Sequence, residues 1–334
     1  MESPPPLTRP FSIASVSVPN RVVLAPMAGI TNSAFRRRLK TFGAGLVSTE
    51  MVSAYGLVYG NRRTLDYLWF TEDERPVAVQ LFADRPDVVA AAVELVLSRQ
   101  PRPEVIDLNM GCPVKKVMKT GAGAALLAAP EDAAALAVAA VGAAMPHGVP
   151  VTVKIRSGLD ADRPVAVEVA RRLEEAGVAA LGVHPRAATQ LYRGRADHRI
   201  TAAVVAAVGI PVIASGDIDS FCAADRVLRE TGAQAVMVAR GMLGDPWLVR
   251  DLLLGAEGRR PTVAEAATEL AALLHEAQVD MGPTRAVRWL RKLNGWYLRR
   301  AGAPSGMVSE LHGVADLAEL QAALLRIAER VVRE

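Results

Sequence analysis

The chain has 334 residues, of which 51% are hydrophobic and 22% charged, so it is too apolar for a disordered protein and suits one large domain with at most a small second one. Its 39 basic and 35 acidic residues leave a net charge of +4, which alone indicates no particular partner. Two cysteines exclude a disulfide framework, and no apolar run approaches the roughly 18 residues of a membrane span. Because the proline-rich start also lacks the features of a signal peptide, we expect a cytoplasmic protein. Two cysteines are too few for a multi-cysteine zinc site, so we expect no metal.

Taken in chain order, short apolar runs alternate with segments of helical length from residue 20 to residue 255. Runs that are apolar throughout are typical of parallel strands buried on both faces. The candidate strands are Val22–Ala25, Leu46–Ser48, Val77–Phe82, Val105–Asn109, Val151–Ile155, Ala180–Val183, Val212–Ala214 and Ala235–Ala239. The candidate helices between them lie near 33–41, 87–99, 131–144, 164–176, 200–208, 221–231 and 246–254.

Eight strand–helix units of this length match the size of a closed (β/α)8 barrel. An open doubly wound sheet is the competing fold, but it usually has fewer strands and a G-x-G-x-x-G turn after the first one. That turn is absent from this sequence. We therefore predict an α/β TIM barrel over residues 1–255.

After a polar hinge at Gly255–Pro261 the pattern becomes wholly helical, which predicts a C-terminal all-helical domain over residues 256–334. Three long helices are expected at 263–281, 284–301 and 316–332. The second carries six basic residues and no acidic one between positions 285 and 300. Such a surface indicates contact with phosphate, whereas the interleaved Trp289, Trp296 and Tyr297 are expected to pack mostly inward. Arg36–Arg38 either extends this basic strip or forms a solvated face.

The active site of a TIM barrel lies at the C-terminal ends of its strands. Small residues follow the last two strands here, in Ser215-Gly216-Asp217 and Ala239-Arg240-Gly241. Small side chains allow backbone N–H groups to approach a phosphate, and Arg240 can add a charged contact. Two ordinary turns are the alternative for each segment alone, but their joint position favours a phosphate site.

Lys154 and Gln80 lie inside apolar strands, where a polar side chain is costly to bury without a partner. Lys154 could form a Schiff base, as in aldolases, or contact an anionic ring; an ion pair with Asp107 or Glu50 is the structural alternative. Gln80 offers a donor and an acceptor to a planar heterocycle, or it is satisfied by neighbouring backbone.

Cys112 lies in the loop Asn109–Pro113, which follows the fourth predicted strand. Lys115 and Lys116 come directly after it, so the thiol is expected in an electropositive place that suits proton transfer. The alternative is a small buried side chain, which is how we interpret Cys222. No histidine is adjacent in the sequence, which argues against a cysteine protease.

These motifs resemble those of the tRNA-dihydrouridine synthases, most closely their bacterial B-type branch, and the similarity extends over the whole chain. The matching segments are Ala25–Asn32, Asp107–Pro113 with its Asn-x-Gly-Cys-Pro, Val153–Gly158, His184–Arg186, Arg291–Lys292 and Trp296–Leu298. The resemblance implies an FMN-containing TIM barrel with a C-terminal tRNA-binding domain. It also implies reduction of uridine in the tRNA D-loop with NADPH as reductant.

The resemblance assigns roles to residues of this chain. Cys112 would donate a proton to C5 of uracil, while C6 receives a hydride from reduced FMN. The residues implied in holding FMN are Pro26, Met27, Ala28, Gln80, Lys154, His184, Ser215, Gly216, Asp217, Ala239 and Arg240. Those expected to contact substrate or tRNA are Asn109, Lys115, Lys116, Arg156, Arg186, Arg285, Arg288, Arg291 and Lys292. Relatives usually have Asn at position 215 and Gly at position 239, but both departures keep the site small.

Two other functions remain open from the residues alone. An FMN barrel acting on a small molecule, such as a dihydroorotate dehydrogenase, would not need the basic tail. A tRNA-binding protein without catalysis would not need Cys112 and Lys154. We expect a monomer that binds no membrane, and the sequence leaves open which uridine is modified.

Overall fold

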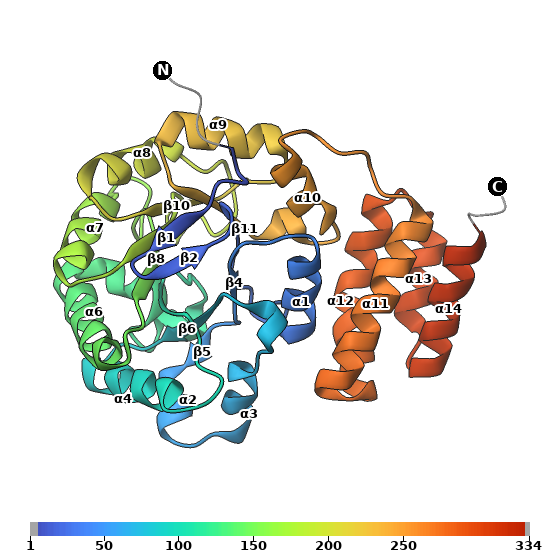
Figure 1. Cartoon of the computed structure of the whole chain (residues 1–334), viewed down its shortest axis with the longest axis horizontal. Coiled ribbons are helices and arrows are strands. Elements are labelled where there is room, and N and C mark those ends of the chain that lie inside the picture. Colours follow the sequence, from blue (N-terminus) through green and yellow to red (C-terminus); the bar gives the residue numbers. More distant parts are fainter. Residues whose placement is uncertain (1–5, 331–334) are drawn as a thin grey trace.

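The computed structural model describes residues 6–330, so the proline-rich start and the last two residues of the final predicted helix lie outside the described residues. Within this range, nine parallel strands form one sheet (Figure 1), in which the short β5 (Val52–Ser53) pairs with β6 beside the path and the other eight follow one another around one axis. In spatial order, they are β3 (Val22–Leu24), β11 (Ala235–Val238), β10 (Val212–Ser215), β9 (Ala180–His184), β8 (Val151–Arg156), β7 (Val105–Met110), β6 (Val77–Phe82) and β4 (Val47–Ser48). A parallel bridge from Val23 to Leu46 joins β3 to the segment entering β4 and closes the barrel. The predicted TIM barrel and its eight strands are confirmed.

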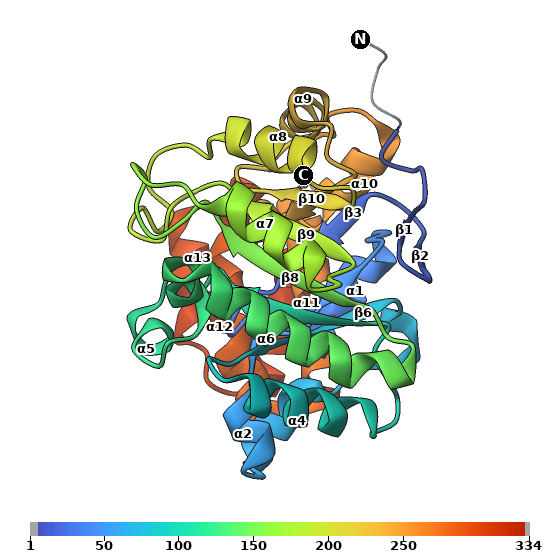
Figure 2. The ribbon, with the colours of Figure 1, turned by 90° about the vertical axis from the view of Figure 1, so that its left-hand side faces the viewer.

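Helices cover the outside of the barrel, and Figure 2 shows four of them, α4, α6, α7 and α8, side by side opposite the C-terminal helices. The helices predicted here are all present: α1 (Ser33–Thr41), α4 (Pro86–Leu97), α6 (Pro130–Ala144), α7 (Ala166–Glu175), α8 (His198–Ala207), α9 (Phe221–Thr231) and α10 (Trp247–Leu254). Their starts follow local chemistry, since Asn32 and Ser220 cap α1 and α9 with side-chain oxygens. None of the helices in residues 6–330 is long and apolar enough to cross a membrane.

An antiparallel hairpin, β1 (Phe11–Ile13) and β2 (Val16–Val18), was not predicted from the sequence. Phe11, Ile13 and Val18 are buried against side chains of the barrel interior, among them Ala180 and Ala235 at the N-terminal ends of their strands. The hairpin therefore closes the end of the barrel opposite the predicted active site.

A bundle of four helices follows the barrel within the described chain and lies beside α1 (Figure 1). Its members are α11 (Val263–Met281), α12 (Pro283–Arg300), α13 (Ser305–Gly313) and α14 (Leu317–Arg330). Leu270, Leu290 and Tyr297 are fully buried in its core, as expected for most of the aromatic residues. The sequence predicted all but α13, whose nine residues follow Pro304 in a short polar segment.

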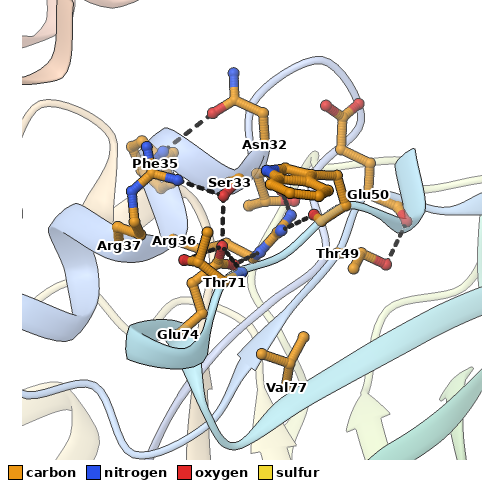
Figure 3. Close-up of polar contacts among 12 residues, drawn as sticks. Asn32, Ser33, Phe35, Arg36, Arg37, Thr49, Glu50, Thr71, Glu74 and Val77 are labelled. Carbon is orange, nitrogen blue, oxygen red and sulfur yellow. Dashed lines mark hydrogen bonds and ion pairs between the residues drawn. The ribbon is translucent and has the colours of Figure 1, made fainter. Parts of the chain in front are cut away.

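Ion pairs join α1 of the barrel to α11 of the bundle. Arg37 donates to Glu276 at 2.9 Å and to Asp280 at 3.0 Å, and Arg38 pairs with Glu269 at 2.5 Å. Arg36 is buried and pairs at 2.5 Å with Glu74, which lies in the 3₁₀ turn Glu72–Glu74 before β6 (Figure 3). Both alternatives for these arginines, an extension of the basic strip and a solvated face, are therefore wrong, because carboxylates pair with all three side chains.

A second contact joins the bundle to the loop that follows β11. Arg300 pairs with the buried carboxylate of Asp245 at 2.5 Å. Gly244, the residue before Asp245, has a φ of +76°. A side chain at position 244 would overlap the backbone of Trp296 in α12. Bundle and barrel are thus held together through two separate sets of polar contacts.

Candidate active site

A cavity of about 660 Å³ opens at the C-terminal ends of the strands, within the ~300–1,000 Å³ typical of cofactor sites. The residues predicted to hold the cofactor come together here, although they are spread over more than 200 positions of the sequence. The predicted residues that line the cavity are Pro26, Met27, Ala28, Gln80, Asn109, Cys112, Lys154, Arg156, His184, Ser215, Gly216, Asp217, Ala239 and Arg240.

The loop that carries Cys112 is held by hydrogen bonds of its backbone. The Oδ1 atom of Asn109 accepts from the N–H groups of Gly111 at 3.2 Å and Cys112 at 2.9 Å. The Cys112 carbonyl accepts from Ala124 at 3.0 Å, and a Cβ atom at Gly123 would lie only 2.8 Å from that carbonyl oxygen. The partly exposed thiol is therefore positioned at the cavity by contacts that do not use its sulfur.

A chain of side-chain hydrogen bonds fixes Gln80 below this loop. Its Oε1 accepts from Asn109 at 2.8 Å, and its Nε2 donates to Asp107 at 2.6 Å. Asp107 also accepts from Thr152 at 2.7 Å, and burial raises the pKa of this carboxyl to about 6. Because an amide has two N–H groups, one of those on Gln80 remains for a ligand.

Lys154 lies in the cavity wall and makes no hydrogen bond or close ion pair with a side chain among residues 6–330, although Asp107 and Cys112 lie near enough to oppose part of the fall in its pKa. Burial, together with the neighbouring Arg156, lowers its pKa to about 8. The expected structural alternative, an ion pair with Asp107 or Glu50, is wrong. Asp107 is engaged by Gln80 and Thr152, and Glu50 accepts from the Gly29 backbone. A buried ammonium in a cavity wall that lacks a hydrogen-bond acceptor favours an anionic or strongly accepting ligand.

His184 ends β9 and is nearly buried. Burial, reinforced by the positive charges of Lys154 and Arg156, holds its pKa well below the usual range, so the ring is neutral. Gly216 packs against it with a φ of +111°, and a Cβ atom there would lie 2.8 Å from His184 Cδ2. Glycine is therefore required at this wall, and its absent side chain leaves the backbone open to a ligand.

Asp217 follows in the left-handed region, with a φ of +53°. Its carboxylate accepts from Arg186 at 2.7 Å and from the Ala196 backbone at 2.8 Å. Burial opposes ionisation, but these hydrogen bonds and the nearby Arg240 lower its pKa overall. A carboxylate repels phosphate, so Asp217 can bind a phosphate only through its backbone N–H. Its carboxylate can instead orient Arg240, whose guanidinium lies 3.7 Å away.

Two predicted tRNA contacts have buried guanidinium groups. Arg186 does not line the cavity and donates to Gly194 and Asp217, so no part of it is available to a polyanion, which corrects the expectation. Arg156 donates to the carbonyls of Gly111 at 2.9 Å and Leu191 at 2.8 Å. It therefore braces the cavity wall that it lines.

Most of the other predicted tRNA contacts lie on the surface. Lys115 and Lys116 are exposed on α5 (Lys115–Met118), directly after the Cys112 loop. Arg285 and Arg288 are exposed on α12. Arg291 instead donates to the Val314 carbonyl at 2.9 Å inside the bundle. Lys292 reaches the barrel and donates to the Gly29 carbonyl at 3.3 Å.

Tyr192 is a cavity residue that sequence reasoning missed. It belongs to the loop after β9 and lies under two guanidinium groups, with Arg240 at 4.7 Å and Arg156 at 5.6 Å from the ring centre. Such contacts hold an exposed aromatic ring in place. The only signal in the sequence is one tyrosine in a loop rich in arginine, which does not reveal where the loop folds.

Comparisons with known proteins agree with this geometry. A family model described as "Dihydrouridine synthase (Dus)" matches residues 23–331. The chain is 38% identical over 290 residues to tRNA-dihydrouridine synthase B of Pseudomonas aeruginosa, covering 86% of each chain. It is 39% identical to a probable tRNA-dihydrouridine synthase of Rhizobium leguminosarum, covering 90% of this chain and 91% of the relative. A solved variant of NCR from Zymomonas mobilis shares the fold, with a TM-score of 0.57 and 14% identity over 77% of this chain and 94% of that one.

Proposed function

The chain belongs to the dihydrouridine synthase family, and from this premise we propose that it reduces uridine to 5,6-dihydrouridine in the D-loop of tRNA. The observation that carries the proposal is that a partly exposed Cys112 and a partly buried Lys154, whose ammonium makes no hydrogen bond among residues 6–330, line one cavity. The first suits proton donation, and the second suits an electron-rich ring. An enzyme that acts on a small molecule would not need the basic helical bundle. The family match over residues 23–331, which includes the bundle, also argues against such an enzyme.

FMN is the cofactor that the cavity residues fit. Lys154 and the free N–H of Gln80 would contact its ring system, and the backbone of Ser215, Gly216 and Arg240 would hold its phosphate. The chemistry that FMN supplies when bound is transfer of a hydride to C6 of the uracil ring. We propose NADPH as the reductant that restores it.

Cys112 would complete the reduction by giving a proton to C5 as the C5–C6 double bond becomes single. The thiol is left as a thiolate, and water returns the proton. The loop geometry supports this role, because Asn109 fixes the backbone and leaves the sulfur free. Proton donation of this kind accelerates a reaction by typically ~10²–10⁴-fold.

We propose that residues 1–255 perform the chemistry and residues 256–334 hold the tRNA. The target base must leave its stack to reach the cavity, at a cost of a few kcal/mol. The exposed cations Lys115, Lys116, Arg285 and Arg288 are placed to offset this cost by binding phosphates on both sides of the junction.

Mapping of dihydrouridine in tRNA from a strain that lacks this gene tests the proposal. We expect at least one D-loop position to lose its dihydrouridine and to regain it with the wild-type gene but not with Cys112→Ala. An unchanged dihydrouridine map in the deletion strain would contradict the proposed function.

A further inference from the structure

The turn that follows β10 carries two backbone N–H groups without an acceptor. Gly216 and Asp217 both line the active-site cavity, and neither N–H donates a hydrogen bond among residues 6–330. Their φ angles are +111° and +53°. Successive N–H groups in a turn of this kind form a concavity that binds anions. The direction in which these peptides point therefore decides whether the turn can hold a phosphate.

His198 contacts this turn from outside the cavity. It is the first residue of α8 on the outer face of the barrel (Figure 1), and it does not line the cavity. Its Nε2 atom lies 3.0 Å from the carbonyl oxygen of Gly216. A carbonyl oxygen can only accept a hydrogen bond, so Nε2 carries the proton and donates it.

The environment of the ring supports this tautomer. Nδ1 of His198 lies 3.4 Å from the hydroxyl of the buried Thr201, which can donate to it. Burial is the largest cause that lowers the pKa of His198, so the ring is neutral at pH 7. A neutral imidazole has one donor and one acceptor, and both have a partner here.

The hydrogen bond from His198 sets the direction of the peptide between Gly216 and Asp217. This peptide is trans. In a planar trans peptide the C=O and the following N–H point in opposite directions. Because the Gly216 carbonyl points to His198, the Asp217 N–H points away from His198 and toward the cavity.

The opposite direction would suit the backbone better. Rotation of this peptide plane changes ψ of Gly216, which glycine tolerates, and φ of Asp217. The rotation would take Asp217 out of the left-handed region, which residues with a side chain rarely adopt. It would also turn a carbonyl oxygen toward the cavity, where it would repel a phosphate. His198 thus stabilises the orientation that suits an anion.

The other contacts of the turn do not fix this peptide. The Ala196 N–H donates to the Asp217 carboxylate at 2.8 Å, and Arg186 donates to the same carboxylate at 2.7 Å. Both hold the side chain of Asp217. His198 is the only hydrogen-bond donor to the Gly216 carbonyl among residues 6–330.

We propose that His198 is a positioning residue for the phosphate of the cofactor: its Nε2–H holds the Gly216 carbonyl outward, so that the Asp217 N–H faces the phosphate. The same hydrogen bond makes that N–H a stronger donor, because hydrogen bonds in a chain polarise one another. This inference rests on the proposed function, which requires FMN in the cavity. His198 acts only through the backbone of the turn.

The test compares dissociation constants of the full chain, freed of flavin, for FMN and for riboflavin, which has the same ring system but no phosphate. His198→Phe keeps a ring and removes both nitrogens, whereas His198→Gln offers an amide N–H in place of Nε2. His147→Phe is the matched control, because His147 pairs with Glu94 at 2.9 Å outside the cavity. Melting temperatures verify folding, and His198→Leu replaces His198→Phe if the latter does not fold.

We expect His198→Phe to weaken FMN binding by about tenfold and to leave riboflavin binding within about twofold of wild type. His198→Gln should recover FMN binding to within about threefold, since one hydrogen bond is restored. His147→Phe should change neither constant.

A folded His198→Phe that binds FMN as tightly as the wild type would overturn the inference. Equal losses for FMN and riboflavin would overturn it as well, because His198 would then support the cavity as a whole and not the phosphate. The same holds if His198→Gln binds FMN as weakly as His198→Phe. The proposed function fails separately, if the wild type binds no FMN or if the deletion strain keeps its dihydrouridine.

Discussion

Cys112 owes its place in the active-site cavity to its backbone, which Asn109 and Ala124 hold, and not to its own side chain. Cys112→Ala should therefore bind FMN as the wild type does, while dihydrouridine formation slows by ~10²–10⁴-fold. Single-turnover reduction of tRNA by the pre-reduced protein measures this step. Cys222→Ala, at an exposed position, is the control that should react normally. A rate within threefold of wild type for Cys112→Ala would refute proton donation by this thiol.

Lys154 gives the cavity a pH dependence. Because burial lowers its pKa to about 8, the ammonium is charged at pH 7 and loses its proton as the pH rises through that value. Only the charged form attracts an anionic or electron-rich ligand, so the affinity for FMN should fall between pH 7 and pH 9. Fluorescence titration of the apoprotein with FMN measures the effect. Lys154→Gln should bind more weakly at pH 7 and lose the dependence; an unaltered pH profile in this variant would contradict the assignment.

Much of the cavity could be predicted from single residues, because a lysine or glutamine inside an apolar strand is conspicuous. The partners of these residues could not. Gln80 is satisfied by Asp107 and Asn109 from the neighbouring strand, which depends on strand register. Arg186 was expected to contact substrate or tRNA, yet it is buried beneath the loop of Arg193 and Gly194, whose path no local sequence pattern predicts.

Among the elements, α1 and α11 set the orientation of the bundle on the barrel. Arg38→Glu and Glu269→Arg should each destabilise the protein by about 3 kcal/mol, because each leaves like charges facing one another in a mostly buried contact. The double variant restores an ion pair and should recover most of the loss. Urea unfolding measures the free energies. Additive losses in the double variant would show that the pair does not couple.

The elements differ in how well sequence predicts them. The eight barrel strands are short continuous apolar runs, and α11 is bounded by a capping box at Thr262 and Glu265. The hairpin β1–β2 was missed because each of its strands, Phe-Ser-Ile and Val-Ser-Val, has a polar residue at its centre and is too short to show a clear alternation, whereas the short barrel strands stand out as apolar runs. The hairpin becomes buried only against the completed barrel, so no local sequence pattern predicts it.

At the scale of the whole molecule, the exposed cations are divided between the barrel and the bundle. Replacing Lys115, Lys116, Arg285 and Arg288 with glutamine should weaken tRNA binding and flatten its dependence on salt. The logarithm of the association constant falls linearly with the logarithm of the salt concentration. Each lost phosphate contact makes this slope less steep by roughly 0.7–0.9, so the loss of all four should make it less steep by about three. Binding isotherms from 50 to 300 mM salt measure this slope. A slope equal to that of wild type would place the tRNA elsewhere.

The hairpin at the bottom of the barrel has a kinetic consequence. Phe11, Ile13 and Val18 are buried against the N-terminal ends of the strands, so the cavity opens at the C-terminal end of the barrel. Under the proposed function, nicotinamide and uridine would reach the reacting ring through this opening in turn, and each would leave before the other binds. A tRNA that dissociates slowly after its base is reduced would delay the next turnover, so the highest affinity for tRNA would not give the highest turnover rate.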